Sequence, residues 1–297
     1  MRMITARLAI AIAIPIVASA QAAPPATDVY LAPLTIRGMQ ITVGAPLNIT
    51  SRPGYDNQPS FTPDGRAVLY TSIRDGQSDI YRYDLESKAT TRLTTTPESE
   101  YSATVMPGGR RFSVIRVEKD STQRLWSFDM SGGDPRLVLE AVKPVGYHAW
   151  LDSTTLALFV LGQPNALVVA STTSVRVDTL ARDIGRSLAT PPGGQASATF
   201  TFVKRNADST WGVIAGIKDN AGWRTQPVMS LPRGAEYVVW PGPDRAVTAT
   251  GTKILIRTAL TAPWVEAGDF EAAGIRSITR LAISRDGQWI AFAAEPR

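Results

Sequence analysis

The sequence contains no cysteine and a single histidine, His148, among its 297 residues. It can therefore form no disulfide framework, thiolate metal site or cysteine nucleophile, and a multi-histidine zinc centre is excluded. A Ser-His-Asp triad would have to use His148, and neither a Walker loop nor a dinucleotide-binding loop is present. We therefore expect no catalytic residue, no bound metal and no cofactor.

Long apolar runs are also scarce, and the one that matters lies at the N-terminus. Arg2 and Arg7 precede or border an apolar stretch at residues 8–17, and small residues follow at 18–22. This order is typical of a secretory signal peptide, and the stretch is shorter than the roughly 20 residues that span a bilayer. We expect cleavage of residues 1–22, which leaves residues 23–297 as one periplasmic or secreted domain without a transmembrane segment. The alternative is an uncleaved anchor.

The excess of positive charge is small. The chain has 31 basic and 26 acidic residues, and removal of Arg2 and Arg7 leaves 29 basic residues and a charge of +3. The basic residues are dispersed, with nothing longer than pairs such as Arg110 and Arg111. This distribution argues against a nucleic-acid partner. Because 44% of the residues are hydrophobic and 19% are charged, the chain can bury a core.

A unit of about 44 residues repeats along the chain. Its clearest copy has a turn at Thr62-Pro63-Asp64-Gly65, followed by β-rich segments at 67–72 and 79–84. The residues that precede the first turn of each unit are separated by 44, 45, 40, 50 and 43 positions, and they are Phe61, Val105, Trp150, Thr190, Trp240 and Ile283. The starts of the third strands give a second series with the same period, and they are Ile80, Leu125, Leu167, Trp211 and Ile254. Two series with one period predict six supersecondary units.

The sixth unit ends before its third and fourth strands, and matching segments occur at the other end of the chain. Asp28-Val29-Tyr30 is similar to Asp79-Ile80-Tyr81, and residues 46–50 are similar to the segment around Leu93 and Thr94. We therefore predict an all-β, six-bladed β-propeller of four-stranded antiparallel blades, in which N-terminal strands complete the last blade and close the ring. The alternative is an open β-sandwich with fortuitous periodicity.

The first unit, from Pro59 through Thr62-Pro63-Asp64-Gly65 to Asp84, resembles the propeller repeat of TolB, the periplasmic protein of the Tol-Pal cell-envelope system. Ile283-Ser-Arg-Asp-Gly287 resembles it more loosely, and Trp150-Leu-Asp-Ser-Thr-Thr-Leu156 resembles a degenerate variant. The resemblance implies a TolB-like propeller. This chain departs from TolB in one respect, because fewer than ten residues separate the expected cleavage region from the first strand, and we therefore expect no α/β domain before the propeller, so membership of the Tol-Pal system is not implied. The resemblance implies little about function, because related repeats also occur in peptidases of the prolyl oligopeptidase type.

The blade-to-blade loops and the innermost strands should bring polar residues to the mouth of the propeller channel. The candidate binding residues are Asp56, Glu100, Tyr147, His148, Arg186, Glu236 and Arg280. Asp56 and Glu100 each lie five residues before an anchor, so we expect them in equivalent positions on adjacent blades. His148 has two open interpretations, a hydrogen-bonded structural residue or a group that binds or transfers a proton.

Three functions remain open. The favoured one is a monomeric, non-catalytic module that binds a protein or peptide partner at the bacterial cell envelope, because a mouth of mixed charge suits such a partner. A metal-dependent hydrolase or lactonase would require Asp56 and Glu100 to point at one site. A glycan-binding propeller would require two or more exposed tryptophan rings on one face. We expect instead that five tryptophans pack in the core, namely Trp126, Trp150, Trp211, Trp240 and Trp289.

Overall fold

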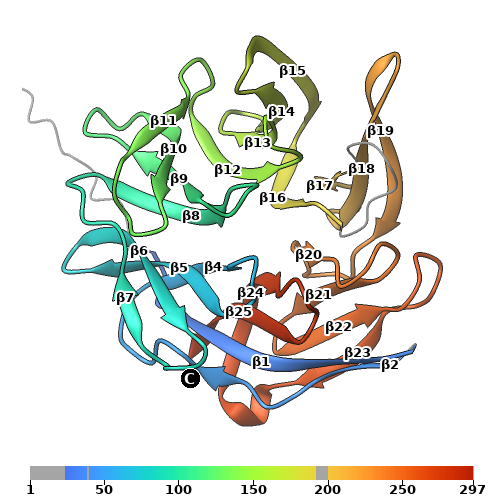
Figure 1. The fold of residues 1–297 in the computed structure, drawn as a ribbon. Coiled ribbons are helices and arrows are strands. Elements are labelled where there is room, and N and C mark those ends of the chain that lie inside the picture. The colour runs from blue at the N-terminus through green and yellow to red at the C-terminus, as the bar shows by residue number, and fades with distance from the viewer. Residues whose placement is uncertain (1–23, 39, 192–199, 297) are drawn as a thin grey trace, which may run out of the picture.

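The computed structural model describes residues 24–38, 40–191 and 200–296, and it is a ring of six antiparallel sheets (Figure 1). The innermost strands of blades one to six are β4 (Asp56–Phe61), β8 (Ser99–Val105), β12 (Val145–Trp150), β16 (Ile184–Ala189), β20 (Val238–Val239) and β24 (Ile275–Ile283). The second strands are β5 (Ala67–Arg74), β9 (Arg111–Val117), β13 (Thr155–Val160), β17 (Phe200–Arg205), β21 (Ala246–Thr250) and β25 (Trp289–Pro296). The predicted six-bladed β-propeller is confirmed.

The outer two strands of each blade follow in chain order. The third strands are β6 (Gln77–Asp84), β10 (Gln123–Asp129), β14 (Ala166–Ser171), β18 (Trp211–Asp219), β22 (Lys253–Arg257) and, in blade six, β1 (Asp28–Arg37). The fourth strands are β7 (Thr90–Arg92), β11 (Arg136–Leu139), β15 (Ser174–Arg182), β19 (Gly222–Ser230), β23 (Val265–Asp269) and, in blade six, β2 (Gln40–Val43) together with β3 (Leu47–Asn48). One 3-10 turn, η1 (Glu271–Ala273), precedes β24. Within these residues, no helix is long and apolar enough to cross a membrane.

The predicted ends of the innermost strands are accurate to within one residue, whereas the predicted starts of the third strands differ by up to three residues, as at β6, which begins at Gln77 and not at Ile80. The anchors of blades one, two, three and six are the last residues of their innermost strands, whereas Thr190 and Trp240 lie one residue beyond β16 and β20. Prolines follow both of these anchors directly, at Pro191 and Pro241. Because proline has no backbone N–H, it cannot continue the ladder. In the first turn of blade one, Gly65 takes a φ of 69° and donates its N–H to the Thr62 carbonyl oxygen at 2.9 Å.

The hydrophobic core consists of six clusters, one at each junction between neighbouring blades. Successive side chains of a strand point to opposite faces of its sheet, so each blade supplies two clusters. In β5, Val68 and Tyr70 pack toward blade six, whereas Leu69 packs toward blade two. Each fully buried side chain of this size contributes about 1.5–3 kcal/mol to stability. The blades are therefore rigid supports for the inner strands and their loops.

Ring closure depends on β1, which pairs with β25 from Asp28↔Ala294 to Pro33↔Trp289. Two segments share the fourth position of blade six. β3 pairs with the first half of β1 at Tyr30↔Asn48, and β2 pairs with the second half of β1 from Leu34↔Val43. The sequence predicted the region of β3, but it did not predict that β1 would continue into a hairpin with β2. The predicted signal peptide, residues 1–22, lies outside the described residues.

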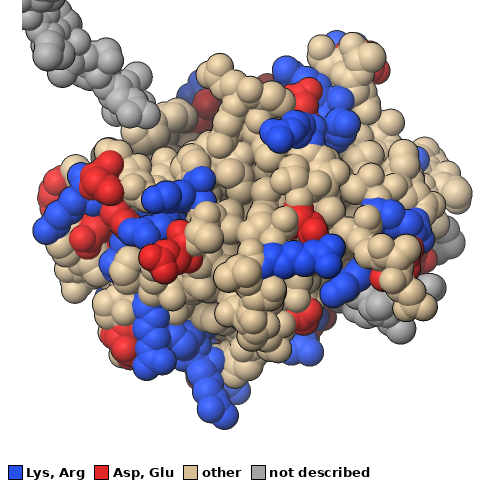
Figure 2. All heavy atoms as spheres, turned by 90° about the horizontal axis from the view of Figure 1, so that it is seen from above, with Lys and Arg blue, Asp and Glu red and all other residues tan. Residues whose placement is uncertain are grey.

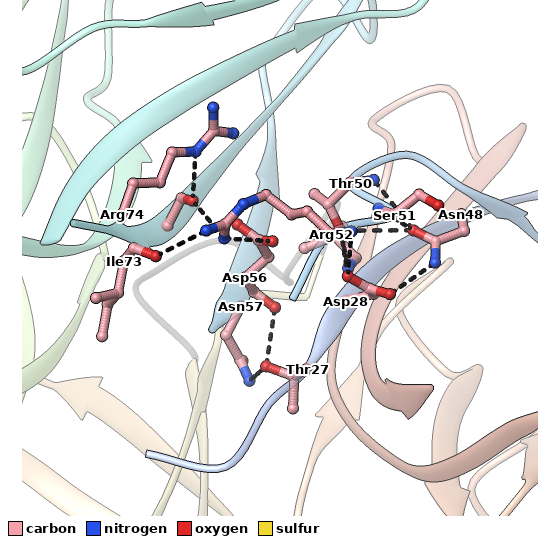
Figure 3. Close-up of polar contacts among 12 residues, drawn as sticks. Thr27, Asp28, Asn48, Thr50, Ser51, Arg52, Asp56, Asn57, Ile73 and Arg74 are labelled. Carbon is pink, nitrogen blue, oxygen red and sulfur yellow. Dashed lines mark hydrogen bonds and ion pairs between the residues drawn. The ribbon is translucent and has the colours of Figure 1, made fainter. Parts of the chain in front are cut away.

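Polar contacts around Asp28 fasten the closing strand (Figure 3). The Asp28 carboxylate accepts hydrogen bonds from Asn48 Nδ2 at 2.7 Å and from Thr50 Oγ1 at 3.0 Å, and Thr50 Oγ1 also accepts one from the Val29 N–H at 3.0 Å. Blade one repeats this arrangement with Asp79 and Thr94. The recurrence explains why Asp28-Val29-Tyr30 resembles Asp79-Ile80-Tyr81 in the sequence.

We predict that Asp28→Ala lowers the free energy of unfolding by about 1–3 kcal/mol, because it removes the buried carboxylate that accepts the hydrogen bonds of the partly buried Asn48 and Thr50. Urea denaturation followed by far-ultraviolet circular dichroism measures the change. Asp244→Ala is the matched control, since Asp244 is exposed in a loop, and its effect should stay within about 0.5 kcal/mol. Equal effects of the two substitutions would contradict a fastening role for Asp28.

Candidate functional site

One position of the innermost strand faces the channel in every blade. It lies three residues before each anchor, and the six residues at this position are Gln58, Ser102, Tyr147, Ser187, Tyr237 and Arg280. In blade five, Tyr237 directly precedes β20. All six line a central cavity of about 150 Å³. Tyr147 and Arg280 were predicted from the sequence, and the other four were missed, although their common offset from the anchors was a signal that could have identified them.

β-bulges turn three of these side chains toward the channel. The strand registers shift next to Gln58, Ser102 and Arg280, whose φ angles are 57°, 55° and 37°. A left-handed residue in a strand breaks the simple alternation of side chains and redirects its own side chain. The bulges therefore decide which residues of blades one, two and six reach the cavity, and the strand pattern alone did not predict them.

A wider cavity of about 410 Å³ opens at one mouth of the channel. Four predicted site residues line it, namely Tyr147, Arg186, Glu236 and Arg280. Tyr55, Asn57 and Tyr237 line it as well, and Thr27 and Glu295 bring the two ends of the described chain to the same mouth. The structure therefore brings together four of the seven candidate residues, contributed by blades three to six.

Arg186 and Glu236 form an ion pair between blades four and five at this mouth. The Arg186 Nε and Nη2 atoms each lie 3.3 Å from an oxygen of the Glu236 carboxylate, which also accepts the Arg186 backbone N–H at 3.0 Å. Half of the Arg186 side chain is exposed, so the pair adds at most about 1 kcal/mol to stability. The pair connects β16 of blade four to the loop before β20 of blade five, and it leaves half of the Arg186 side chain exposed at the mouth.

Arg280 reaches from blade six across the channel and lies against two tyrosine rings. Its Nη2 donates a hydrogen bond of 2.6 Å to the Tyr147 hydroxyl. Its Cζ lies 4.3 Å from the ring centroid of Tyr147 and 4.5 Å from that of Tyr237. Contacts of this kind stabilise a cation by about 0.5–2 kcal/mol each. The guanidinium therefore has a fixed orientation at the neck between the two cavities.

Burial keeps the hydroxyl groups of Tyr55 and Tyr237 protonated at neutral pH. Burial raises the pKa of Tyr55 to about 12, although the nearby Arg280 acts in the opposite direction. Burial also raises the pKa of Tyr237 well above its usual value. Both phenols can therefore donate hydrogen bonds to a bound group.

His148 lies apart from the wide mouth, between the central cavity and the cavity at the opposite end. Its Nε2 lies 2.6 Å from Ser113 Oγ, which also accepts a hydrogen bond from Trp150 Nε1 at 2.9 Å. Burial lowers the pKa of His148 to about 3, so the imidazole is neutral at physiological pH. These contacts favour the structural interpretation of His148.

Asp56 and Glu100 occupy equivalent positions in adjacent blades, but the structure corrects their expected place at the mouth. Both side chains are fully buried, and neither lines the central cavity or the mouth, although Asp56 belongs to β4 and Glu100 to β8. Asp56 Oδ2 lies 3.1 Å from Arg52 Nη1, as Figure 3 shows, and Glu100 Oε1 lies 3.0 Å from Arg116 Nε. Each carboxylate thus has its own arginine and is directed away from the channel. Sequence spacing gave the blade position of these residues but not the direction of their side chains.

The positions of the carboxylates and of the tryptophans can be compared with what the hydrolase and glycan-binding alternatives require. Asp56 and Glu100 do not converge on one site, and within the described ranges no group of three or more His, Asp or Glu side chains could hold a metal ion. All seven tryptophans are described, and Trp150 and Trp240 are buried while the other five are partly buried. Basic side chains cover several of the partly buried rings, as when Arg116 Cζ lies 4.4 Å from the ring centroid of Trp126. Neither alternative finds the geometry that it requires.

The comparisons with known proteins agree with the repeat pattern. Residues 31–144 match the family model of the TolB β-propeller domain. The repeats in this segment are similar to those of the TolB propeller. The chain is 50% identical to the Tol-Pal system protein TolB of Bordetella pertussis over 38 residues. This matched segment is 13% of this chain and 9% of that protein. The chain is 26% identical to an uncharacterized protein of Agrobacterium fabrum over 106 residues. This matched segment is 33% of this chain and 36% of the relative.

Solved structures show the same fold over almost the whole chain. A putative TolB from Agrobacterium tumefaciens has a TM-score of 0.69 at 14% identity, with 91% of this chain and 99% of that chain covered. A gluconolactonase from Xanthomonas campestris has a TM-score of 0.61 at 10% identity, with 93% and 99% covered. At these identities the likeness shows a shared propeller fold, and neither protein's activity follows for this chain.

We predict that His148 makes stability fall in acid. Because its pKa is about 3 when folded and near 6.5 when unfolded, the unfolded chain binds a proton first as the pH falls below 6.5. The cost should reach about 2 kcal/mol at pH 5 and should be absent above pH 7.5. Urea unfolding of the wild type and of His148→Gln at both pH values isolates this contribution. A constant difference between the two proteins would show that His148 is not held neutral.

Glu100 should show the opposite dependence. Burial raises its pKa to about 7, above the unfolded value of 4.5, so its contribution to stability is present in acid and is lost as the pH rises from about 4.5 to 7. The stability of Glu100→Gln relative to the wild type should therefore increase between pH 5 and pH 8, as measured by urea unfolding. The exposed Glu140→Gln control should show no such trend.

Proposed function

We propose that this chain is an exported, TolB-like β-propeller that binds a protein or peptide partner at the bacterial cell envelope without catalysing a reaction. In this proposal, residues 1–22 are a signal peptide, and residues 23–297 are one monomeric periplasmic domain. The observation that carries the proposal is the preorganised mouth, where Arg280 lies between Tyr147 and Tyr237 beside the Arg186–Glu236 pair. Rigid blades hold these groups in place before any partner arrives.

The chemistry of the mouth suits binding better than catalysis. The phenols of Tyr55 and Tyr237 have raised pKa values, so they remain protonated near pH 7. A general acid or base works best with a pKa near the operating pH. His148, the residue best suited to that role by type, is held neutral and buried against Ser113.

The composition of the mouth resembles that of protein interfaces. Tyrosine and arginine side chains contribute a large share of the binding energy in such interfaces, particularly where they occupy a concave, partly desolvated surface. Here they come from five blades, one, three, four, five and six, so a partner would contact several blades at once. On the side of the ring seen in Figure 2, basic and acidic side chains lie next to one another with uncharged surface between them. This mixture favours a polar protein partner over a polyanion such as nucleic acid.

A charge reversal at the mouth tests the proposal. We predict that Arg186→Glu, which breaks the pair with Glu236 and reverses the charge, reduces capture of the partner from a periplasmic extract at least tenfold. The readout is quantitative affinity capture with identification of the retained protein. Arg176→Glu is the matched control, because Arg176 belongs to an exposed pair with Asp178 on the outer strand β15.

Both variants should retain the thermal unfolding midpoint of the parent to within a few degrees, because surface pairs add little stability. Full capture by Arg186→Glu, or an equal loss with Arg176→Glu, would exclude this mouth as the binding surface. If the partner were captured only by protein that still carries residues 1–22, this result would contradict the proposed periplasmic location.

A further inference from the structure

Arg280 is held at the boundary between the central cavity and the wide mouth, and its side chain lines both. Three blades determine its position, because the residue belongs to blade six while Tyr147 and Tyr237 come from blades three and five. The hydrogen bond of 2.6 Å to the Tyr147 hydroxyl fixes the rotation of the guanidinium between the rings. Such a fixed donor needs no rearrangement to receive a ligand.

The charge of this guanidinium has no carboxylate counterpart within the described residues. Arg186, at the same mouth, is paired with Glu236, and the buried Arg116 is paired with Glu100, whereas Arg280 makes no ion pair in this part of the chain. The two tyrosine rings offer their π faces to it, but neither neutralises it. A partly buried cation without a counterion favours the binding of an anion.

Further donors surround the same point. Within the described ranges, the hydroxyl groups of Tyr55 and Tyr237 make no hydrogen bond to protein, and both residues line the mouth with Arg280. They are protonated at neutral pH for the reasons given above, so each offers an O–H. The side chains of Gln58 and Ser102 line the adjoining cavity. The neck is thus rich in donors around one fixed positive charge.

We propose that Arg280, with the hydroxyl groups of Tyr55 and Tyr237, binds a carboxylate that a peptide partner inserts into the channel. The carboxylate belongs to an acidic side chain or to a chain terminus of the partner. This inference rests on the proposed function, since it names the group of the partner that enters the mouth. The planar fork of a guanidinium matches the two oxygens of a carboxylate.

Charge and size favour a carboxylate over a larger or more highly charged group. The wide mouth is lined by two arginines and by the carboxylates of Glu236 and Glu295, so its formal charges balance. A dianionic phosphate would meet the two carboxylates as well as the guanidinium groups. The central cavity, at about 150 Å³, accommodates a side chain but not a helix, whose diameter is about 10 Å.

The probes are two pairs of short peptides, and the members of each pair differ only in whether they carry a carboxylate or the corresponding amide. Two carry a central Asp or Asn in an acetylated and amidated Gly-Gly-X-Gly-Gly frame, and two end in Ala with either a free carboxylate or an amide. Binding to the purified protein is followed by calorimetry and by the NMR signals of the tyrosine rings. We expect at least one acid to bind at least tenfold more tightly than its amide. The pair that shows this difference identifies the source of the carboxylate.

Arg280→Gln should remove this preference, and Tyr237→Phe, which deletes one hydroxyl group, should weaken acid binding about three- to tenfold. Arg276→Gln is the matched control, since Arg276 lies on the same strand, is exposed and does not line the mouth cavity. It should leave the affinity unchanged. The conservative Tyr237 variant gives an independent answer if Arg280→Gln does not fold.

Equal affinity for acids and amides, an undiminished preference in both mouth variants, or tighter binding of inorganic phosphate than of either acid would overturn the assignment. Failure of the wider proposal looks different. If Arg186→Glu still loses the partner while no peptide acid binds, the interaction surface stands and the carboxylate site falls. If Arg186→Glu retains the partner while the acids bind through Arg280, the carboxylate site stands and the proposed interaction surface falls.

Discussion

The pairing of β1 with β25 is the constraint on which the rest of this molecule depends. It joins the first described strand to the last, and it supplies blade six with the outer half that the C-terminal segment does not contain. Without it, β25 would present an unpaired edge, and the clusters on both sides of blade six would lose Val29, Leu31 and Tyr30. Asp28 strengthens this seam through its contacts with Asn48 and Thr50. The channel keeps its shape because the ring is closed.

The sequence was sufficient for the architecture because the repeat reflects a packing requirement. Each blade must bury both faces against its neighbours, so the apolar pattern and the turn residues recur with the length of one blade. Phe61 and Val105 end their innermost strands as their spacing predicted, and Asp28 and Asp79 make the same contacts in two blades. The exceptions are Thr190 and Trp240, where prolines end the strands one residue earlier.

The sequence was less informative about the site, for a reason that lies in the backbone. The bulges at Gln58, Ser102 and Arg280 change the direction of single side chains without changing the spacing of the repeat. The placement of Asp56 and Glu100 could not be inferred from their offset, because it depends on the partners Arg52 and Arg116. Tyr147, Arg186, Glu236 and Arg280 were placed at the mouth correctly, since loops and strand starts of neighbouring blades necessarily meet there.

The two ends of the described chain reach the same mouth, where Thr27 and Glu295 stand beside the arginines and tyrosines. Thr27 also bonds to the backbone of Gly54 and Asp56, so the seam of the ring forms part of the wall of the mouth. A partner seated there would contact both sides of the seam. Opening of blade six would then destroy the binding surface, and binding would in turn hold the ring closed. Partner binding and ring closure are then thermodynamically linked, and the free energy of unfolding is higher for the propeller with its partner bound than for the free propeller.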